Sequence, residues 1–172
     1  MRRKSVVIFG SPCARSVRLG IEPISPFSAP GRAGRARFTL PGTPDEPAPY
    51  LSYTPNAYLG RMTEVIIANA PGRLYLDQIY ETDMAEGLKA MALAGHGIAF
   101  LPHSAVEDAV AEGKLIRLDR AARGTPEGQY TLTMEIRLYR DKLAAQGEDP
   151  RQVLVRQLWD AVTGELAQGA AA

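Results

Sequence analysis

Cysteine, histidine and long apolar runs are scarce in this sequence, and each shortage excludes a class of protein. The single Cys13 excludes an internal disulfide framework and a cysteine-based metal site, because both need several thiols. Nothing approaches the roughly 18 consecutive apolar residues of a membrane-spanning helix. Residues 1–10 imitate the start of a signal peptide, but the apolar run at 6–9 is far shorter than the roughly 7–15 residues that such a core needs. We therefore expect a cytoplasmic protein.

An excess of charge of one sign is also lacking, since 20 Lys and Arg oppose 19 Asp and Glu and the formal net charge is +1. That balance does not support broad binding to a polyanion. The distribution is uneven, because eight basic residues precede residue 50 and only Glu22, Asp45 and Glu46 oppose them. The eight are Arg2, Arg3, Lys4, Arg15, Arg18, Arg32, Arg35 and Arg37. This segment has no aromatic interleaving and no nucleic-acid motif, so we favour a solvated surface over a nucleic-acid contact.

With 172 residues and 45% hydrophobic content, the chain is long enough for one large domain or two small lobes and is not wholly disordered. Residues 1–48 are rich in Pro, Gly, Arg and Ser and show little periodicity. A short extended piece is expected at 21–25, broken by Pro23 and Pro26. The proline-dense stretch 41–49 predicts an extended linker or a crossover between lobes.

From residue 49 onward, strand and helix patterns alternate. Period-two alternation or short apolar runs predict strands, whereas apolar residues at i, i+3 and i+4 predict helices. The predicted strands are 50–53, 74–80, 98–101, 115–118 and 130–139, and the predicted helices are 55–69, 83–93, 105–112 and 150–166. This order argues for an α/β lobe with a mainly parallel sheet.

Several residues are expected to shape these elements. Thr54 is expected to cap the helix that follows it, with Pro55 in the first turn. Gly95 and Gly97 are expected to supply the positive φ that ends the 83–93 helix. The residues predicted to face inward are Tyr58, Leu59, Met62, Val65, Ile66, Leu74, Leu76, Ile79, Leu88, Met91, Leu93, Leu132, Met134, Ile136, Leu138, Val153, Leu154, Leu158, Trp159 and Val162.

The stretch 83–102 reads Asp-Met-Ala-Glu-Gly-Leu-Lys-Ala-Met-Ala-Leu-Ala-Gly-His-Gly-Ile-Ala-Phe-Leu-Pro, and it resembles the effector-binding domain of LysR-type transcriptional regulators. Further segments follow in the order of that family, at 49–53, 56–61, 104–108, 113–118 and 134–140. The similarity covers 21–165 and leans toward a subgroup of oxidant-responsive regulators.

The resemblance implies an α/β, periplasmic-binding-protein-like (type 2) fold of Rossmann-like lobes, the second complete and the first partial. Residues 1–48 would be an atypical N-terminal segment with a remnant of regulatory subdomain I. Residues 49–140 would form regulatory subdomain II, and 141–172 a C-terminal helix returning to subdomain I. A winged helix-turn-helix needs two apolar-patterned helices around a tight turn, and 1–48 hold no such pair.

The function that the resemblance implies is to bind a small-molecule effector between two lobes, or to sense an oxidant, and so to control transcription. It further implies a homodimer, no enzymatic activity and no cofactor, with DNA bound only through a winged helix-turn-helix that this chain lacks. Two alternatives stay open: a stand-alone small-molecule-binding protein of the same fold, and a truncated gene remnant.

In this family the effector lies at the carboxyl ends of strands and the N-termini of helices, where free amide donors suit an anionic or carbonyl-bearing ligand. Carried onto this sequence, the expected effector-binding residues are Tyr53, Thr54, Asn56, Tyr58, Gly97, Ile98, Phe100, Pro102 and His103, with Ser25 and Ser28 from the crossing segment. Four of them have a structural alternative: Thr54 as a helix cap, Tyr58 as packing, and Ile98 and Phe100 as core.

Other chemistry finds less support. His96 and His103 stand without a cluster of further ligands, so no metal site is expected. A predicted strand at 6–9 leading to Cys13 is similar to the phosphatase Cys-x5-Arg loop, but Arg18 comes one residue too early. A cysteine-dependent phosphatase is therefore the least favoured function. Oxidation of Met62, Met84, Met91 or Met134 to the sulfoxide is a possible signal, although Met62, Met91 and Met134 lie on predicted apolar faces and filling of the core is their favoured role.

Overall fold

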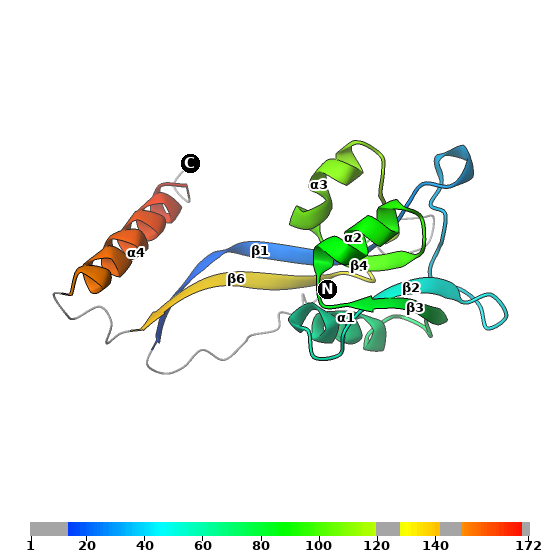
Figure 1. Ribbon diagram of the computed structural model, residues 1–172, viewed down its shortest axis with the longest axis horizontal. Coiled ribbons are helices and arrows are strands. Elements are labelled where there is room, and N and C mark those ends of the chain that lie inside the picture. Colours follow the sequence, from blue (N-terminus) through cyan, green and yellow to red (C-terminus); the bar gives the residue numbers. More distant parts are fainter. Residues whose placement is uncertain (1–13, 120–127, 142–148, 170–172) are drawn as a thin grey trace. The chain divides into compact units, whose positions relative to one another are not determined.

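The computed structural model describes residues 14–119, 128–141 and 149–169, which divide into two compact units (Figure 1). The described part of the first unit is 22–119 with 128–133. Of the 19 buried hydrophobic residues in the described part of the chain, only Met134 belongs to the second unit. The hydrophobic core therefore lies in the first unit.

The first unit is built on a mixed β-sheet. Its strands are β1 (Ala14–Ser28), β2 (Ala48–Tyr53), β3 (Leu76–Thr82), β4 (Ile98–Pro102) and β5 (Ile116–Arg117), in the order β3-β2-β4-β1-β5. The pairs β2–β3 and β2–β4 are parallel, whereas β1 runs antiparallel to both β4 and β5. The predicted parallel arrangement is confirmed for β2, β3 and β4, whereas β1, which the sequence did not place in that sheet, adds antiparallel pairs.

Helices cover both faces of this sheet. The α-helices are α1 (Tyr58–Ala68), α2 (Ala85–Leu93) and α3 (His103–Ala111), and a short 3-10 turn, η1, spans Arg32–Gly34. Figure 1 shows α2 and α3 on one side of β2 and β4 and α1 on the other. The main core cluster lies under α2 and α3 and consists of Phe27, Leu51, Tyr53, Leu88, Ala92, Ala99, Leu101, Val106 and Leu115.

Strand β1 runs through two prolines that were expected to break it. Pro26 pairs with Phe100 of β4, and its carbonyl accepts a hydrogen bond from the Leu118 N–H at 2.9 Å. The expectation that Pro23 and Pro26 interrupt the strand was wrong, because the fixed φ of proline suits extended backbone and proline only removes one donor.

Two local predictions around α1 and α2 need correction. Helix α1 begins at Tyr58 with Ala57 at the N-cap position, so Thr54 does not cap it. Thr54 instead closes a turn, in which its carbonyl accepts the Ala57 N–H at 3.0 Å. In α2 the buried partner of Leu88 is Ala92, and Leu93 is 36% exposed.

The two glycines after α2 serve different purposes. Gly95 has a φ of +77°, as predicted for the turn that ends the helix. Gly97 does not have a positive φ. It is required instead by a close approach, since a Cβ there would lie 2.7 Å from the Pro49 carbonyl oxygen. The predicted positive φ at Gly97 was wrong.

The second unit contains the first part of β1, most of β6 (Leu132–Asp141) and α4 (Pro150–Gly169), with β6 paired to β1. The Arg140 guanidinium lies 4.7 Å from the Trp159 ring centroid of α4. Three side chains predicted to face inward are exposed there: Ile136 at 43%, Leu154 at 65% and Leu158 at 62%. Ile79 of edge strand β3 is likewise 48% exposed, because no strand flanks β3 on its outer side within the described residues.

Three further points concern predictions about the N-terminal residues, a helix-turn-helix and a membrane span. The strand predicted at 6–9 and the loop ending at Cys13 fall outside the described residues. Within the described residues, every two successive α-helices are separated by a strand, so no helix-turn-helix occurs there. No described helix combines the length and the apolar character needed to cross a membrane.

Candidate functional site

A chain of polar contacts joins several elements of the first unit at the carboxyl end of β4. The His103 Nε2 and Ser25 Oγ atoms are 2.8 Å apart, and Ser25 Oγ lies 2.6 Å from Thr131 Oγ1. The Thr131 hydroxyl donates to an Asp119 carboxylate oxygen, and the other oxygen of Asp119 lies 2.8 Å from Arg117 Nε. Ser25 and Asp119 are almost fully buried, so each relies on these contacts instead of water.

Strand alternation and pairing explain why the side chains of this polar network meet. Ser25 pairs with Leu101 and Phe27 pairs with Ala99, so all four residues face the α2 and α3 side of the sheet. The Phe27 ring meets the His103 imidazole edge-on at 5.7 Å between centroids. The first residue of α3 is thereby held against β1.

The electrostatics around His103 favour its neutral form. Burial and the nearby Arg117 guanidinium lower the pKa of His103 from its ordinary value of 6.5, and the carboxylates of Asp119 and Glu22 offset part of that effect. Glu22 also accepts a hydrogen bond from the Ser104 N–H at 3.1 Å. One amide at the start of α3, expected to be free for a ligand, is therefore occupied by a carboxylate of the chain itself.

The start of α1 is different, because no side chain caps it. The Thr54 hydroxyl makes no hydrogen bond within the described residues, and the Asn56 side chain is exposed. Arg61 folds back toward this end of the helix, where its Nη1 donates to the Asn56 carbonyl at 2.8 Å and its guanidinium lies 5.9 Å from the Tyr58 ring centroid. Unused amide donors and a nearby guanidinium can together hold a negatively charged or carbonyl oxygen.

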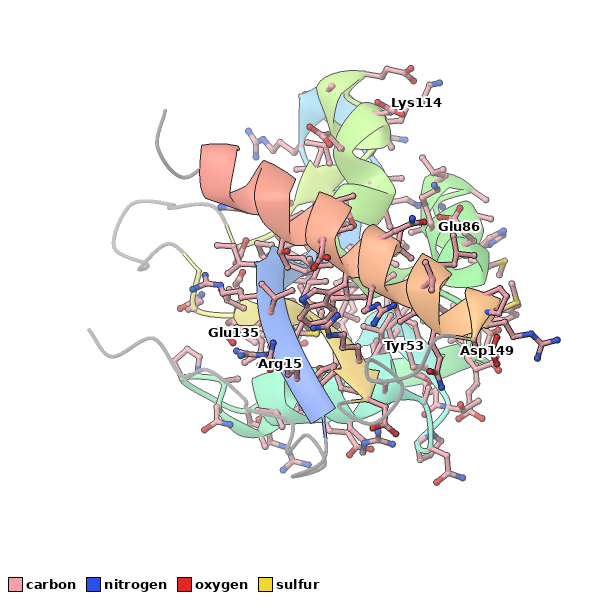
Figure 2. All side chains as sticks on the ribbon, turned by 90° about the vertical axis from the view of Figure 1, so that its left-hand side faces the viewer. Arg15, Tyr53, Glu86, Lys114, Glu135 and Asp149 are labelled. Carbon is pink, nitrogen blue, oxygen red and sulfur yellow. The ribbon has the colours of Figure 1, made fainter. Side chains whose placement is uncertain are left out.

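Tyr53, at the end of β2, adds an unusual feature. Its side chain lies in the main core cluster, and its hydroxyl is buried without a hydrogen-bond partner in the described part of the chain. Burial, together with Tyr50, raises the pKa of Tyr53 well above its ordinary value, so the hydroxyl stays protonated. Figure 2 shows Glu86 and Lys114 projecting at the periphery, in contrast to Tyr53, which is 4% exposed. Buried hydroxyls normally have a partner, so this one is an unmet hydrogen-bonding group.

The structure brings only some of the predicted site residues together. Ser25, Tyr53 and His103 share the α2 and α3 face, whereas Ile98 and Phe100 point to the opposite face, where Phe100 meets Tyr50 edge-on.

The remaining predicted residues lie in different surroundings. Pro102 is buried and pairs with Ile24 of β1, and Gly97 is pressed against the backbone at Pro49. The buried Ser28 hydroxyl donates to the Ala29 carbonyl and accepts the Phe38 N–H, both at 3.3 Å. Tyr58 is 37% exposed.

Sequence reasoning missed five polar residues that shape this region. They are Glu22, Arg61, Arg117, Asp119 and Thr131. The contacts that give Glu22 and Thr131 their roles span 82 and 106 positions, so no local spacing reveals them. Arg61 could have been found from the sequence, because it lies only five positions after Asn56, whose carbonyl it contacts. Among the described residues, no group of three or more His, Cys, Asp or Glu side chains could hold a metal ion.

Comparison with known proteins identifies the family to which the chain belongs. Residues 11–167 match the family model described as LysR substrate binding domain. The chain therefore belongs to the LysR substrate-binding domain family, which has a periplasmic-binding-protein-like fold and serves transcriptional regulation.

Two curated transcriptional regulators are similar in sequence to this chain. The HTH-type transcriptional regulator YjiE of Escherichia coli K12 is 31% identical over 71% of this chain and 39% of its own length. The HTH domain-truncated transcriptional regulator QseD of Escherichia coli O157:H7 is 30% identical over 71% of this chain and 49% of its own length. The matches thus span less than half the length of these curated relatives.

Solved structures agree on the fold. The apo regulatory domain of HypT from Salmonella typhimurium aligns with a TM-score of 0.74 and 24% identity, covering 92% of this chain and 68% of that one. Full-length HypT, described as a hypochlorite-specific LysR-type transcriptional regulator, aligns with a TM-score of 0.71 and 26% identity, covering 86% and 46%.

Proposed function

We propose that this chain is an effector-sensing domain that binds a small molecule at the carboxyl ends of β2 and β4. The observation that carries the proposal is the uncapped start of α1, which follows β2 directly, together with the buried, unpartnered hydroxyl of Tyr53 at the end of that strand. Thr54 supports it as well, because its hydroxyl is not used for capping. Ligand binding controls transcription only as far as the ligand prefers one conformation over another.

The chemistry of the site favours a ligand with an acceptor oxygen directed at α1. Amide donors and Arg61 lie at that helix, whereas the Glu22 carboxylate occupies the start of α3 and disfavours a second negative charge there. Of the predicted residues, Tyr53, Thr54, Asn56 and Tyr58 therefore carry the proposal. Because full-length HypT is described as hypochlorite-specific, an oxidant is a second candidate signal for this chain.

The proposal also covers the domain organisation, the oligomeric state and the way in which DNA is contacted. We assign 1–48 to an N-terminal segment with part of regulatory subdomain I, 49–140 to subdomain II and 141–172 to a helix returning to subdomain I. The domain acts as a homodimer in the cytoplasm and is without catalysis. DNA contact through a winged helix-turn-helix is the role of the longer regulators to which the chain is related.

The test is ligand-induced thermal stabilisation across a panel of small carboxylates and keto acids. Thr54→Ala with Asn56→Ala should abolish the shift produced by the wild-type ligand while leaving the unliganded melting temperature nearly unchanged, since both side chains lack structural hydrogen bonds. The matched control is Thr43→Ala with Asn69→Ala, two side chains remote from the start of α1 that each hydrogen-bond to nearby backbone. The control should keep the full ligand-induced shift. An unchanged shift in the Thr54/Asn56 variant places the ligand elsewhere.

Tyr53→Phe gives a second readout. Removing a buried hydroxyl that has no partner should stabilise the unliganded protein by about 1 kcal/mol, because its desolvation cost disappears. The same change should weaken ligand binding. A variant that is stabilised and binds as tightly as wild type would show that the hydroxyl takes no part.

A further inference from the structure

The loop after β1 is a closed hairpin with arginines at its tip. The Arg37 N–H donates to the Ala29 carbonyl at 2.8 Å, and the Gly31 N–H donates to the Arg35 carbonyl at 2.6 Å. An isolated bridge between Pro30 and Ala36 completes the closure. We call residues 29–37 the arginine hairpin. Its backbone hydrogen bonds fix its shape without help from any arginine side chain.

The backbone at the tip adopts a costly conformation. Ala33 has a φ of +56° and is the only non-glycine residue with a positive φ in the described part of the chain. Gly34 follows with a φ of +70°. A left-handed conformation is unfavourable at a residue with a Cβ. The tight turn holds Arg32 and Arg35 on either side of it, both exposed to solvent.

The charge of the hairpin is not neutralised locally. Between Glu22 and Asp45 the sequence contains no acidic residue, while Arg32, Arg35 and Arg37 fall within it. Arg37 is partly anchored, because its guanidinium lies over Gly95 at the end of α2, 2.8 Å from where a Cβ would stand. Arg32 and Arg35 make no ion pair or hydrogen bond through their side chains within the described residues.

The composition of the arginine hairpin restricts the kind of molecule that it can bind. Apart from its arginines, residues 29–37 are alanine, glycine and proline, so no aromatic or large aliphatic side chain is present to anchor a protein interface. Binding through this loop must therefore be electrostatic and independent of apolar burial. That is the mode in which guanidinium groups bind the phosphates of duplex DNA or enter its minor groove.

We propose that the arginine hairpin is a sequence-independent contact to the phosphate backbone of duplex DNA, made by Arg32 and Arg35 and separate from the effector site. The proposal departs from the expectations that this segment is only a solvated surface and that DNA is bound only through a winged helix-turn-helix, because the structure shows two exposed guanidinium groups without partners among the described residues on a closed loop. It predicts weak binding with a measurable dependence on salt, because each neutralised phosphate releases counterions.

The experiment uses the full chain and a fluorescently labelled duplex of about 20 base pairs and arbitrary sequence, large enough to hold several phosphate contacts. Anisotropy titrations across roughly 20–200 mM salt should give a slope of log K against log salt of about −2 to −3, as expected for two or three phosphates. Arg32→Gln with Arg35→Gln should weaken binding at the lowest salt by about tenfold or more and flatten the slope.

Two further variants make the result specific. Arg73→Gln with Arg151→Gln removes the same charge from two exposed arginines on other elements and should leave the affinity within about twofold of wild type. Arg32→Lys with Arg35→Lys keeps the charge and should restore most of the salt slope. Circular dichroism and melting temperature should be unchanged in all variants, because the hairpin is closed by backbone bonds.

Three outcomes would overturn the proposal. The first is equal binding by wild type and the Arg32/Arg35 glutamine variant. The second is a loss of affinity that lysine does not restore, since the effect would then not be electrostatic. The third is competition by poly-glutamate as effective as by unlabelled duplex at equal charge, which would identify an acidic protein surface as the partner.

Discussion

Ser25 and His103 lie 78 positions apart in the sequence, yet the Ser25 Oγ and His103 Nε2 atoms are joined by a hydrogen bond of 2.8 Å. Ser25 is fully buried and His103 is half-buried, so the serine end of this bond is shielded from water. The same hydroxyl lies 2.6 Å from Thr131 Oγ1. One buried oxygen therefore links β1 to the start of α3 and to the segment that leads into β6.

Removing that oxygen should destabilise the protein. Ser25→Ala leaves both His103 and Thr131 with an unmet hydrogen-bonding group in a buried setting, and we expect a loss of about 1–3 kcal/mol in the free energy of unfolding. Urea denaturation measures this value directly. The matched control is Ser104→Ala, because that side chain is exposed on α3 and should change stability by less than about 0.5 kcal/mol. Equal effects of the two substitutions would contradict the role of Ser25.

Stability should also depend on pH through His103. Burial and Arg117 lower its pKa in the folded state below the unfolded value, so the unfolded chain binds the proton more tightly. The contribution of neutral His103 is therefore fully present above the unfolded pKa of about 6.5 and is lost as the pH falls through the folded pKa. Urea midpoints measured from pH 8 down to pH 5 should fall. His103→Gln should reduce that fall, whereas His96→Gln, at an exposed turn, should not.

Gly60 should be intolerant of a side chain. A Cβ there would come within 2.4 Å of the Thr54 carbonyl oxygen and 3.2 Å of the Tyr53 Cβ, so Gly60→Ala must move the first turn of α1 away from β2. We expect a loss of about 1–3 kcal/mol in unfolding free energy, together with a smaller ligand-induced thermal shift.

The control for Gly60 is Gly164→Ala in α4, where nothing lies within 4 Å of the added Cβ. That substitution should stabilise the protein by about 0.5–1 kcal/mol through helix propensity. Destabilisation of similar size at both positions would show that the crowding at Gly60 is not the cause.

Oxidant chemistry should begin at Met84. Its side chain is 62% exposed, whereas Met62 and Met134 are 6% and 7% exposed. Mild treatment with hypochlorite should convert Met84 to the sulfoxide before either buried methionine, as peptide mass spectrometry would show. In urea the difference should disappear. Prior oxidation of Met62 or Met134 in the folded protein would contradict this order.

Elements with strong local patterns were predictable from the sequence. The strand at 98–101 was placed almost to the residue as β4, because a continuous apolar run between a glycine turn and a proline has few other interpretations. Helices α2 and α3 were found for a similar reason, since each ends at a glycine. The family itself was also recognisable from this region, and the match at 11–167 confirms it.

Other features depend on partners remote in the sequence and could not be predicted. Strand β1 shows no clean alternation, and it is a strand because β4, β5 and β6 pair with it. The exposure of Leu154 and Leu158 likewise depends on what packs beside α4 and not on its own period. Asp119 and Thr131 were missed because their role depends on two hydrogen bonds that the sequence does not reveal. One joins Thr131 to Asp119, and the other joins Thr131 to Ser25, which is more than a hundred positions away.

The pairing of β1 has a consequence for the order in which the protein assembles during its synthesis. Among the described strands, those that hydrogen-bond to β1 are β4, β5 and β6, and β4 begins about seventy residues after β1 ends. Strands β2, β3 and β4 with the helices between them form one contiguous, parallel block that can close first. Strand β1 can then pair with a block that has already formed, and its edge groups that β4 and β5 will bind stay unpaired until that step.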